Sequence, residues 1–361
     1  MPDLKLAIAR LPRNIKSNRY WEIAGGRVYL RVSQRRALLL LPRLGLEGDS
    51  SAGIELYLVW HRFFLGNKKN KLSVALLIRG LGKFGNMTRR LAKSISFCLS
   101  KDLDGVVVPA QAIFSRQWFE EGTSSISARS TLWLGSDLDL DFRRASVDAL
   151  AVSDFFYGSG DDRLFHPRTS SITWSHLASL LKIRKPEAGL GKDVLTLHVR
   201  GGDVFGTRQP ANYGQPPLAF YLFVLGLKKW KKVVLVYQDS SNPVVEGIIE
   251  YCVSRKVSLD KQSSTDTQDV ALLLSATNLA GARGTFIPAI TGLSEHLRNV
   301  YYFEDKFSVI PRKEGVTIHR VIDIDGTYHR EVLSGNWKNS TFQRELMMNY
   351  SISCLAVSTG N

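Results

Sequence analysis

Apolar runs of strand length, alternating with segments of helical periodicity, constrain the fold of this 361-residue chain more than any other feature. Residues 72–78 and 194–198 are almost uninterrupted apolar runs, which is typical of strands buried on both faces of a sheet. Each run is followed by a glycine-containing turn, a helical segment and a second apolar run, at residues 106–108 and 233–237. Because parallel neighbouring strands need a crossover connection, this order predicts two α/β units built on parallel sheets.

Segments of loop-like composition suggest where the chain divides. Residues 66–71 are rich in Gly, Asn and Lys, and residues 185–192 combine Pro and Gly with Lys. The hydrophobic share of 44% and the charged share of 22% are typical of globular proteins with sizeable cores. We predict four parts: a basic, strand-rich N-terminal extension over residues 1–70, an N-terminal α/β domain over 71–188, a C-terminal α/β domain over 189–310, and a segment over 311–361 that packs on the body.

The chain is strongly basic, with 48 Lys and Arg against 33 Asp and Glu and a net charge of +15. Residues 1–70 hold 13 of the basic residues and 5 of the acidic ones, and a second basic cluster occupies residues 228–232. Positive surfaces attract phosphate groups, whether these belong to nucleotides, nucleic acid or lipids. The cluster at residues 228–232 is therefore either a solvated helix end or a contact with a membrane surface.

The cysteine content and the hydropathy of the sequence indicate the cellular compartment in which the protein is expected. The 3 cysteines lie far apart, without a Cys-x-x-Cys pair or a Cys/His cluster, which argues against a disulfide framework and a zinc ribbon. No apolar run approaches the ~18 residues of a membrane span, and the start of the sequence lacks the apolar core of a signal peptide. We expect a cytoplasmic protein, with peripheral membrane contact through the basic clusters as an open alternative.

The first candidate motif, Gly80-Leu-Gly82-Lys-Phe-Gly85, lies between a predicted strand and a helix predicted over residues 87–100. This spacing occurs in dinucleotide-binding turns, where glycines let the backbone approach a phosphate at a helix N-terminus. The acid expected at the end of the second strand is missing, because the nearby aspartates precede that strand. The alternatives are a tight turn that permits close packing, or a substrate-facing loop to which Asn86 adds an amide.

A second motif follows the buried strand over residues 194–198. A strand would place His198 and Arg200 on one face, and two glycines and Asp203 come next. Ligands bind at the carboxyl ends of the strands in parallel sheets, and an arginine fork matches phosphate oxygens. The motif therefore predicts a phosphate-binding loop. The alternative is a turn closed by an Arg200–Asp203 ion pair, with His198 satisfied inside the core.

A third motif combines an acid and a glycine-containing turn. Asp269 heads a helix predicted over residues 269–275, and Gly284 and Thr285 precede a helix predicted over residues 288–297. A glycine and a hydroxyl before a helix can hold a phosphate. The alternative is an ordinary strand–helix connection.

In this order, the three motifs resemble those of the GDP-fucose-dependent fucosyltransferases, a group that includes the protein O-fucosyltransferases. The resemblance covers residues 72–305 and depends mainly on the motif from His198 to Asp203, together with Gly284-Thr285-Phe286. It implies a GT-B fold, in which two Rossmann-like domains face each other across the site. It also implies an inverting, metal-independent glycosyltransferase without a cofactor, which transfers fucose from GDP-fucose to a glycan acceptor in surface polysaccharide or glycoconjugate synthesis.

The resemblance further implies a role for each matching residue. Arg200 would hold the donor β-phosphate, and His198 would contact the nucleotide. Asp203 would order the loop or act as a general base. Other substrate contacts would come from Asp269 near the base, from Gly284, Thr285 and Phe286 at the phosphate turn, and from Gly82, Gly85 and Asn86 on the sugar or acceptor side.

Departures from the family pattern leave alternatives open. Gly201 stands where many relatives have a second arginine, and residues 204–215 contain no acid that could serve as base. None of the Asp-x-Asp pairs, of which Asp323 and Asp325 are one, has the setting of a metal site, so we expect no metal. The open alternatives are another nucleotide-sugar donor, a dinucleotide oxidoreductase that uses the first motif, and a basic nucleic-acid-binding protein. Because the sequence lacks a helix-turn-helix, RNA-recognition or zinc motif, we expect no nucleic-acid partner.

Overall fold

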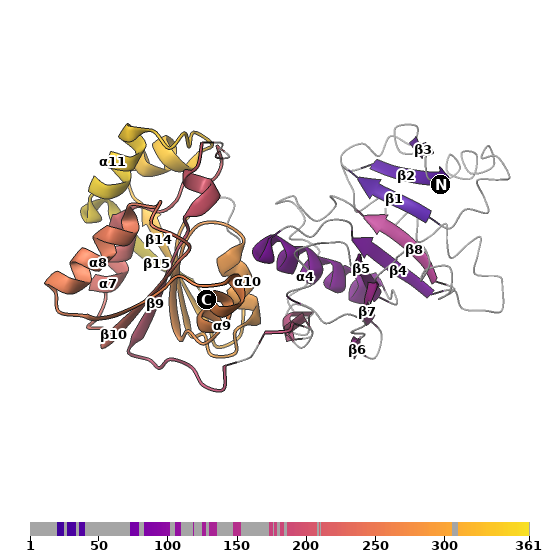
Figure 1. Ribbon diagram of the computed structural model, residues 1–361, viewed down its shortest axis with the longest axis horizontal. Helices are drawn as coiled ribbons and strands as arrows, with labels where there is room; N and C mark the ends of the chain where they lie inside the picture. Colours follow the sequence, from indigo (N-terminus) through magenta and orange to yellow (C-terminus); the bar gives the residue numbers. More distant parts are fainter. Residues whose placement is uncertain are drawn as a thin grey trace. The chain divides into compact units, whose positions relative to one another are not determined.

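The chain divides into two compact units, Met1–Lys182 and Ile183–Asn361, and each is described by itself (Figure 1). In the computed structural model, the described residues are 20–24, 27–33, 36–39, 73–78, 83–101, 105–109, 118, 125–127, 130–135, 147–152, 173–175, 177–178, 181–183, 186–207, 209, 211–304 and 310–360. None of the helices in these segments is both long enough and apolar enough to cross a membrane.

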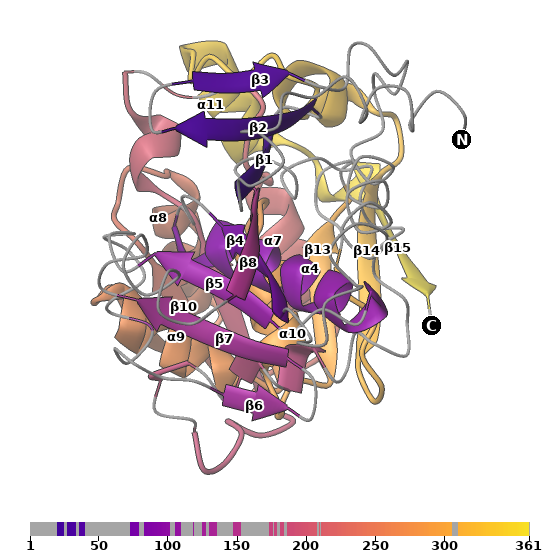
Figure 2. The same cartoon turned by 90° about the vertical axis from the view of Figure 1, so that its right-hand side faces the viewer.

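The first unit contains an eight-stranded sheet in the order β3-β2-β1-β8-β4-β5-β7-β6. Its elements are β1 (Tyr20–Ala24), β2 (Arg27–Ser33), β3 (Arg36–Leu39), β4 (Ser73–Ile78), α4 (Phe84–Lys101), β5 (Gly105–Pro109), β6 (Ser125–Ser127), β7 (Ser130–Gly135) and β8 (Val147–Val152). The five central strands, from β1 through β8, β4 and β5 to β7, pair in parallel. Antiparallel partners extend the sheet at both ends, and Figure 2 shows β5, β7 and β6 following one another at one of them.

The strand–helix–strand unit predicted after residue 72 is present in this sheet. Helix α4 connects the parallel neighbours β4 and β5, and it buries Met87, Leu91 and Ile95, which a helix places on one face. The helix begins at Phe84, three residues earlier than predicted. Strands β1, β2 and β3 all come from residues 1–70, so this part of the chain contributes three strands to the same sheet.

The second unit contains a seven-stranded sheet in the order β11-β10-β9-β12-β13-β14-β15. Its elements are β9 (Val194–Val199), η3 (Gly202–Phe205), α7 (Leu218–Gly226), β10 (Lys232–Tyr237), α8 (Val244–Ser254), β11 (Ser258–Gln262), α9 (Asp266–Leu274), β12 (Asn278–Gly281), α10 (Phe286–Leu293), β13 (Asn299–Phe303), β14 (Thr317–Asp323), η4 (His329–Leu333), α11 (Thr341–Asn349), η5 (Ile352–Cys354) and β15 (Leu355–Gly360). The ladder is parallel except for β15, which runs antiparallel to β14.

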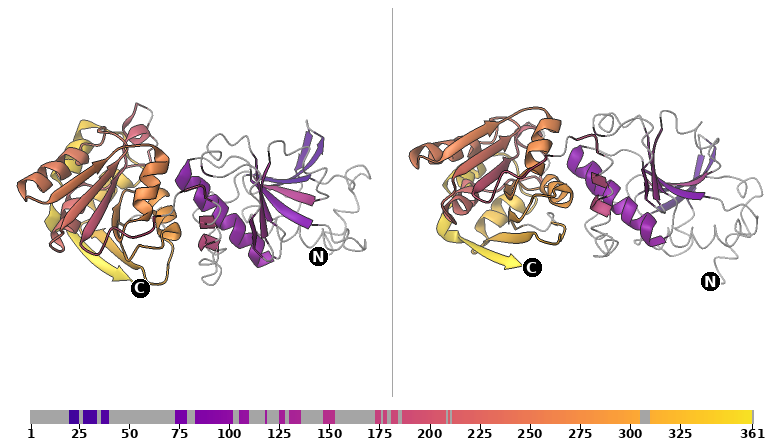
Figure 3. Two further views of the ribbon diagram at one scale, coloured as in Figure 1. Left: turned by 60° about the horizontal axis from the view of Figure 1, so that its bottom comes forward. Right: turned by 90° about the horizontal axis from the view of Figure 1, so that it is seen from below.

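This strand order is that of a doubly wound dinucleotide-binding fold. From β9, the chain builds outward through β10 to β11, then returns and builds in the other direction through β12, β13 and β14. Figure 3 shows helices on both faces of the sheet. The predicted α/β class, with parallel sheets in two units, is therefore confirmed.

The core of the second unit lies between the sheet and the layer of α7, α8 and α11. Helix α7 buries side chains around most of its circumference, because α8, α11 and β15 all contact it. The C-terminal segment contributes directly to this core. The Trp337 side chain is 1% exposed, and its indole Nε1 donates to the Val204 carbonyl at 2.8 Å. Trp337 thus packs against the loop after β9 and fixes the carbonyl of Val204.

Candidate functional site

Two of the predicted motifs meet at one point of the second sheet. The ladder pairs His198 on β9 with Gly281 on β12, and the Ala282 N–H donates to the His198 carbonyl at 3.0 Å. The connections that leave β9 and β12 turn in opposite directions, which makes this edge the switch point of the fold. The motif from His198 to Asp203 and the motif from Gly284 to Phe286 are far apart in the sequence, and the pairing of β9 with β12 brings them together.

Arg200 follows the last residue of β9 and is held by three neighbours. Its Nη2 forms an ion pair with Asp203 Oδ1 at 3.3 Å, and its guanidinium lies 4.7 Å from the ring centre of Tyr213. A Cβ at Gly284 would lie 3.2 Å from Arg200 Nη1, so the turn after β12 passes directly beside the guanidinium. The side chain keeps 22% of its surface exposed, so a ligand at this edge could reach it.

The backbone of the Arg200 loop is fixed by residues of the β10–α8 connection, which we call the loop clamp: Asp239, Ser241 and Asn242. The Asn242 side chain donates from Nδ2 to the Arg200 carbonyl at 2.9 Å and accepts from the Val244 N–H at 3.0 Å. Asp239 Oδ1 accepts from the N–H groups of Gly202 and Ser241, at 3.2 and 2.9 Å, and from the Ser241 hydroxyl. The clamp therefore ties the end of β9 to the start of α8.

Electrostatics at Asp239 agree with this arrangement. Partial burial by itself would raise the pKa of this carboxyl, but hydrogen bonds from Ser241 and from the Gly202 N–H outweigh it and lower the pKa. Asp239 is thus held as a carboxylate that accepts three hydrogen bonds. No motif in the sequence pointed to the clamp.

The two glycines of the loop are required by close contacts with the clamp and its neighbour. A Cβ at Gly201 would lie 2.4 Å from Asp239 Oδ1, and one at Gly202 would lie 2.6 Å from Gln238 Nε2. Gly202 also has a φ of +65°, in the left-handed region that favours glycine. These contacts explain why position 201 carries no side chain here.

The His198 side chain is an uncharged ring that stacks on a neighbouring aromatic side chain. Its ring stacks on Phe286, with centroids 4.8 Å apart and planes 15° apart. Burial, assisted by the positive charge of Arg200, lowers the pKa of His198 to about 3, so the imidazole is neutral at pH 7. Its Nδ1 is buried without a hydrogen-bond partner in the described residues, and the residue as a whole is half-buried. A neutral ring next to Arg200 can contact a nucleotide without adding a second positive charge.

The turn after β12 leads into a helix whose N-terminus lies at the same edge. Gly284 has a φ of +127°, and α10 begins at Phe286, two residues earlier than predicted, with Thr285 as its N-cap. The Thr285 side chain makes no capping hydrogen bond. The partial positive charge at a helix N-terminus favours anions. The turn thus places Gly284, Thr285 and Phe286 beside Arg200 and His198.

Arg283, which the sequence analysis did not single out, is a buried support of this turn. Its side chain is 6% exposed, and Nη1 donates to the carbonyls of Leu333 at 3.0 Å and of Gly214 at 3.4 Å. It thereby links the turn after β12 to η4 and to the loop before α7. The sequence feature that could have pointed to Arg283 as a buried residue is its place between Ala282 and Gly284, directly after the apolar strand β12.

Asp269 does not head its helix, so that expectation is wrong. Helix α9 begins at Asp266 behind Thr265, whose side chain and Gln268 form a capping box. Asp269 lies one residue further along and accepts from Gln262 Nε2 at 3.0 Å. Burial raises the pKa of this carboxyl, and the Gln262 hydrogen bond offsets part of the shift. Because β10 separates β11 from β9, Asp269 lies along the same edge but apart from Arg200.

The first motif belongs to the first unit. Gly82 lies outside the described residues. Gly85 lies in the first turn of α4 rather than in the predicted glycine turn, and Asn86, which we expected just after that turn, lies in the same helical turn. The early start of the helix has a packing cause. The Phe84 ring lies 4.5 Å from that of buried Trp118, and the Thr88 hydroxyl donates to the Phe84 carbonyl at 2.6 Å.

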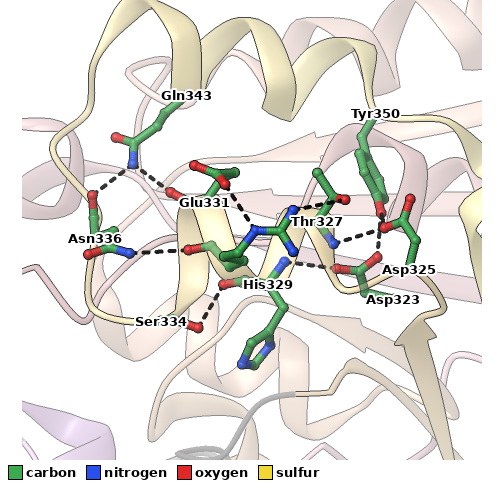
Figure 4. Close-up of polar contacts among 10 residues, drawn as sticks. Asp323, Asp325, Thr327, His329, Glu331, Ser334, Asn336, Gln343 and Tyr350 are labelled. Carbon is green, nitrogen blue, oxygen red and sulfur yellow. Dashed lines mark hydrogen bonds and ion pairs between the residues drawn. The ribbon is translucent and has the colours of Figure 1, made fainter.

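The carboxylates of one Asp-x-Asp pair are engaged in tertiary contacts. The Tyr350 hydroxyl donates to Asp323 Oδ1 and to Asp325 Oδ1, the latter at 2.8 Å (Figure 4). The N–H groups of His329 and Thr327 donate to Asp323 and Asp325, both at 2.8 Å. The Thr327 N–H, assisted by the Tyr350 hydroxyl, lowers the pKa of Asp325 to about 2. This pair joins β14 to η4 and α11, and across the described segments no three His, Cys, Asp or Glu side chains gather as metal ligands would.

Comparisons with known proteins give structural neighbours only. No protein-family model and no curated protein matches the chain. A mutant of Arabidopsis thaliana FUT1 in complex with GDP is 15% identical over 73% of this chain and 78% of its own, with a TM-score of 0.41. POFUT1 in complex with GDP-fucose is 11% identical over 65% of this chain and 98% of its own, with a TM-score of 0.35. The E. coli ADP-heptose LPS heptosyltransferase II is 12% identical over 68% of this chain and 90% of its own, with a TM-score of 0.37. At these TM-scores, the similarities do not by themselves assign a function.

Proposed function

We propose that this protein is an inverting, metal-independent glycosyltransferase, with GDP-fucose as the first candidate donor and a glycan as acceptor. The observation that carries the proposal is the position of Arg200 beside the Gly284 turn, at the switch point between β9 and β12. Nucleotides and their phosphates bind at this point in doubly wound sheets. Fucose is what the resemblance of the motifs to the fucosyltransferases implies, and another nucleotide-sugar donor would suit the same geometry.

In this proposal, Arg200 binds the donor β-phosphate. When the bond from sugar C1 to the phosphate oxygen breaks, the nucleoside diphosphate leaves with additional negative charge. The guanidinium and the N–H groups at the start of α10 stabilise that charge, as a divalent metal ion does in other transferases. The acceptor hydroxyl forms its bond to C1 from the opposite side, which inverts the configuration, and gives up its proton to a base.

The neighbouring residues have supporting roles in this proposal. His198 and Phe286 form a stacked, uncharged wall for the nucleotide. Asp203 pairs with Arg200, as the ion-pair alternative predicts, and we assign it to the order of the loop rather than to the general base. The loop clamp holds the Arg200 backbone, so the guanidinium starts from a fixed position when phosphate arrives.

The test is thermal stabilisation of the full chain by GDP, GDP-fucose, UDP, ADP, CMP and NAD. A nucleotide at a hundred times its Kd stabilises a protein by about 2.7 kcal/mol, which raises the Tm of a domain of this size by roughly 5–10 °C. Loss of a charge-assisted contact in Arg200→Ala should weaken binding about 10- to 100-fold, which would remove about half of that rise at 10-fold and most of it at 100-fold. Arg312→Ala is the control, because Arg312 is exposed on the same unit.

The nucleotide panel separates the alternatives. A shift with GDP or GDP-fucose that is lost in Arg200→Ala and kept in Arg312→Ala supports the proposal. A rise in Tm with UDP, ADP or CMP instead would support a glycosyltransferase that uses a donor with that nucleotide. Stabilisation by NAD that survives Arg200→Ala would favour an oxidoreductase, and no shift with any nucleotide would contradict the proposed site.

A further inference from the structure

The amino-terminal edge of the second sheet carries a cluster of cations, which we call the basic edge. Its members are Lys192, Lys228, Lys229, Lys231, Lys232, Arg255 and Lys256. They lie just before β9, β10 and β11 or, for Lys232, at the first residue of β10, and the ladder pairs Lys232 with both Val194 and Ser258. The starts of three parallel strands therefore lie in a row about 10 Å wide, which is two strand spacings.

Direct contacts confirm that these segments adjoin. Lys228 Nζ donates to the Lys192 carbonyl at 2.7 Å and lies 4.1 Å from the ring centre of Trp230. The Lys231 N–H donates to the Asp193 carbonyl at 2.9 Å. Helices α7 and α8 contact each other and end at Gly226 and Ser254, directly before the segments that carry these cations, so the carbonyl ends of two helices lie close to them in the sequence.

The charge of the basic edge is largely uncompensated. All seven members except Lys232 are exposed, and Lys232 is in an ion pair with Asp260. Asp193 is the other acid among these segments. Screening at physiological salt acts over ~8 Å, so neighbouring cations within this row add to one another at a surface placed against them.

The conformation and exposure of Lys256 are better explained by its charge than by packing. It follows the end of α8 with a φ of +55°, in the left-handed region where glycine or asparagine is favoured. A lysine in that conformation is disfavoured, and its exposed side chain gains little from packing. The positive charge of Lys256 does stabilise the C-terminus of α8, because it interacts favourably with the helix dipole.

We propose that the basic edge binds an anionic membrane surface. Two large apolar side chains accompany the cations: Leu227 is 42% exposed after α7, and Val253 is 70% exposed in the last turn of α8. Cations flanked by exposed aliphatic groups suit a lipid interface, where the aliphatic groups leave water and the cations meet headgroups. A single-stranded nucleic acid would instead call for exposed aromatic platforms, and the Trp230 side chain at this edge is 6% exposed.

Lipid binding at this edge would leave the candidate nucleotide site clear. Strand β9 separates the two, because the basic edge lies before Val194 and Arg200 comes directly after Val199. Six residues of strand span roughly 20 Å. The inference therefore does not depend on the proposed function, and the experiment contains no nucleotide.

The test is co-sedimentation of the full chain with vesicles of phosphatidylcholine alone or with about one third phosphatidylglycerol. The edge variant is Lys229→Glu with Lys231→Glu. The control is Arg312→Glu with Lys338→Glu, which changes the net charge equally at exposed positions elsewhere on the unit. Each lost cation should lower partitioning roughly fivefold, so the edge variant should fall at least ~25-fold.

The outcomes separate lipid from other polyanions. Binding to anionic vesicles alone, lost in the edge variant and kept in the control, supports the proposal, provided that both variants melt like the wild type. Leu227→Ser with Val253→Ser should weaken the vesicle binding that remains at high salt. Equal losses in both charge variants, no binding by the wild type, or a loss of duplex DNA binding with unchanged vesicle binding would each overturn it.

Discussion

Replacing Asn242 by alanine tests whether the loop clamp holds the Arg200 loop. The Asn242 side chain is 1% exposed and makes two hydrogen bonds, to the Arg200 carbonyl and from the Val244 N–H. Alanine leaves both of these backbone groups without that partner. An unsatisfied buried polar group costs about 1–3 kcal/mol, so we expect Asn242→Ala to lower the free energy of unfolding by about 2–4 kcal/mol.

A second variant divides this effect between the two contacts. Asn242→Asp keeps an oxygen for the Val244 N–H but turns a second oxygen toward the Arg200 carbonyl, so repulsion between the two oxygens should limit the stability it retains to less than half of what alanine removes. Asn349→Ala is the control, because Asn349 is exposed near the end of α11 and should change stability by less than ~0.5 kcal/mol.

The assay must report on the second unit alone, because the chain has two units. Hydrogen exchange in increasing urea, read by mass spectrometry on peptides that cover β9 and β10, gives the free energy of opening for that sheet. A loss below about 1 kcal/mol in Asn242→Ala, or equal losses in Asn242→Ala and Asn349→Ala, would refute the idea that the clamp holds the loop.

Two further predictions concern residues beside Arg200. The folded-state pKa of His198 is about 3, below the ordinary value near 6.5, so its contribution to stability is complete above pH 6.5 and declines as the pH falls toward 3. Between about pH 7 and pH 5, the wild type should lose about 2 kcal/mol more than His198→Gln in urea titrations, and parallel curves would contradict the neutral, buried ring. Gly201→Ala should cost about 1–3 kcal/mol and weaken nucleotide binding, because its Cβ would lie 2.4 Å from Asp239 Oδ1. In Gly226→Ala the new Cβ meets nothing within 4 Å, so equal melting temperatures for the two alanine variants would contradict this contact.

The central strands of both sheets could be predicted because their sequences carry the information locally. Strands β4, β9 and β10 are mostly apolar, which identifies a strand buried on both faces without knowledge of its neighbours. Gly201 and Gly202, which follow β9, likewise predicted a turn. Strands β6 to β8 went unpredicted, because residues 125–152 mix apolar and polar side chains without a clear period.

The contacts that build the site could not be predicted, because they join segments far apart in the sequence. Asn242 reaches the Arg200 carbonyl across 42 positions, and Arg283 reaches the Gly214 carbonyl across 69. Loop residues of this kind have no periodicity, and an Asn or Arg in a loop is ordinarily solvated. The start of α10 was misplaced for a related reason: Pro288 suggested the first turn, but Phe286 already stacks on His198 and fixes an earlier start.

The charge at the switch point follows from these contacts. His198 is neutral, and a Cβ at Gly201 would clash with Asp239, so a second arginine cannot replace that glycine without moving the clamp. Arg200 itself is paired with Asp203, whose side chain is 49% exposed. In the proposed function, a diphosphate that binds Arg200 would displace this carboxylate, and the displacement would cost little because exposed ion pairs contribute only about 0–1 kcal/mol. We infer that Asp203 keeps the guanidinium pointed toward the edge until phosphate binds, and that the helix N-terminus at Phe286 supplies the remaining attraction.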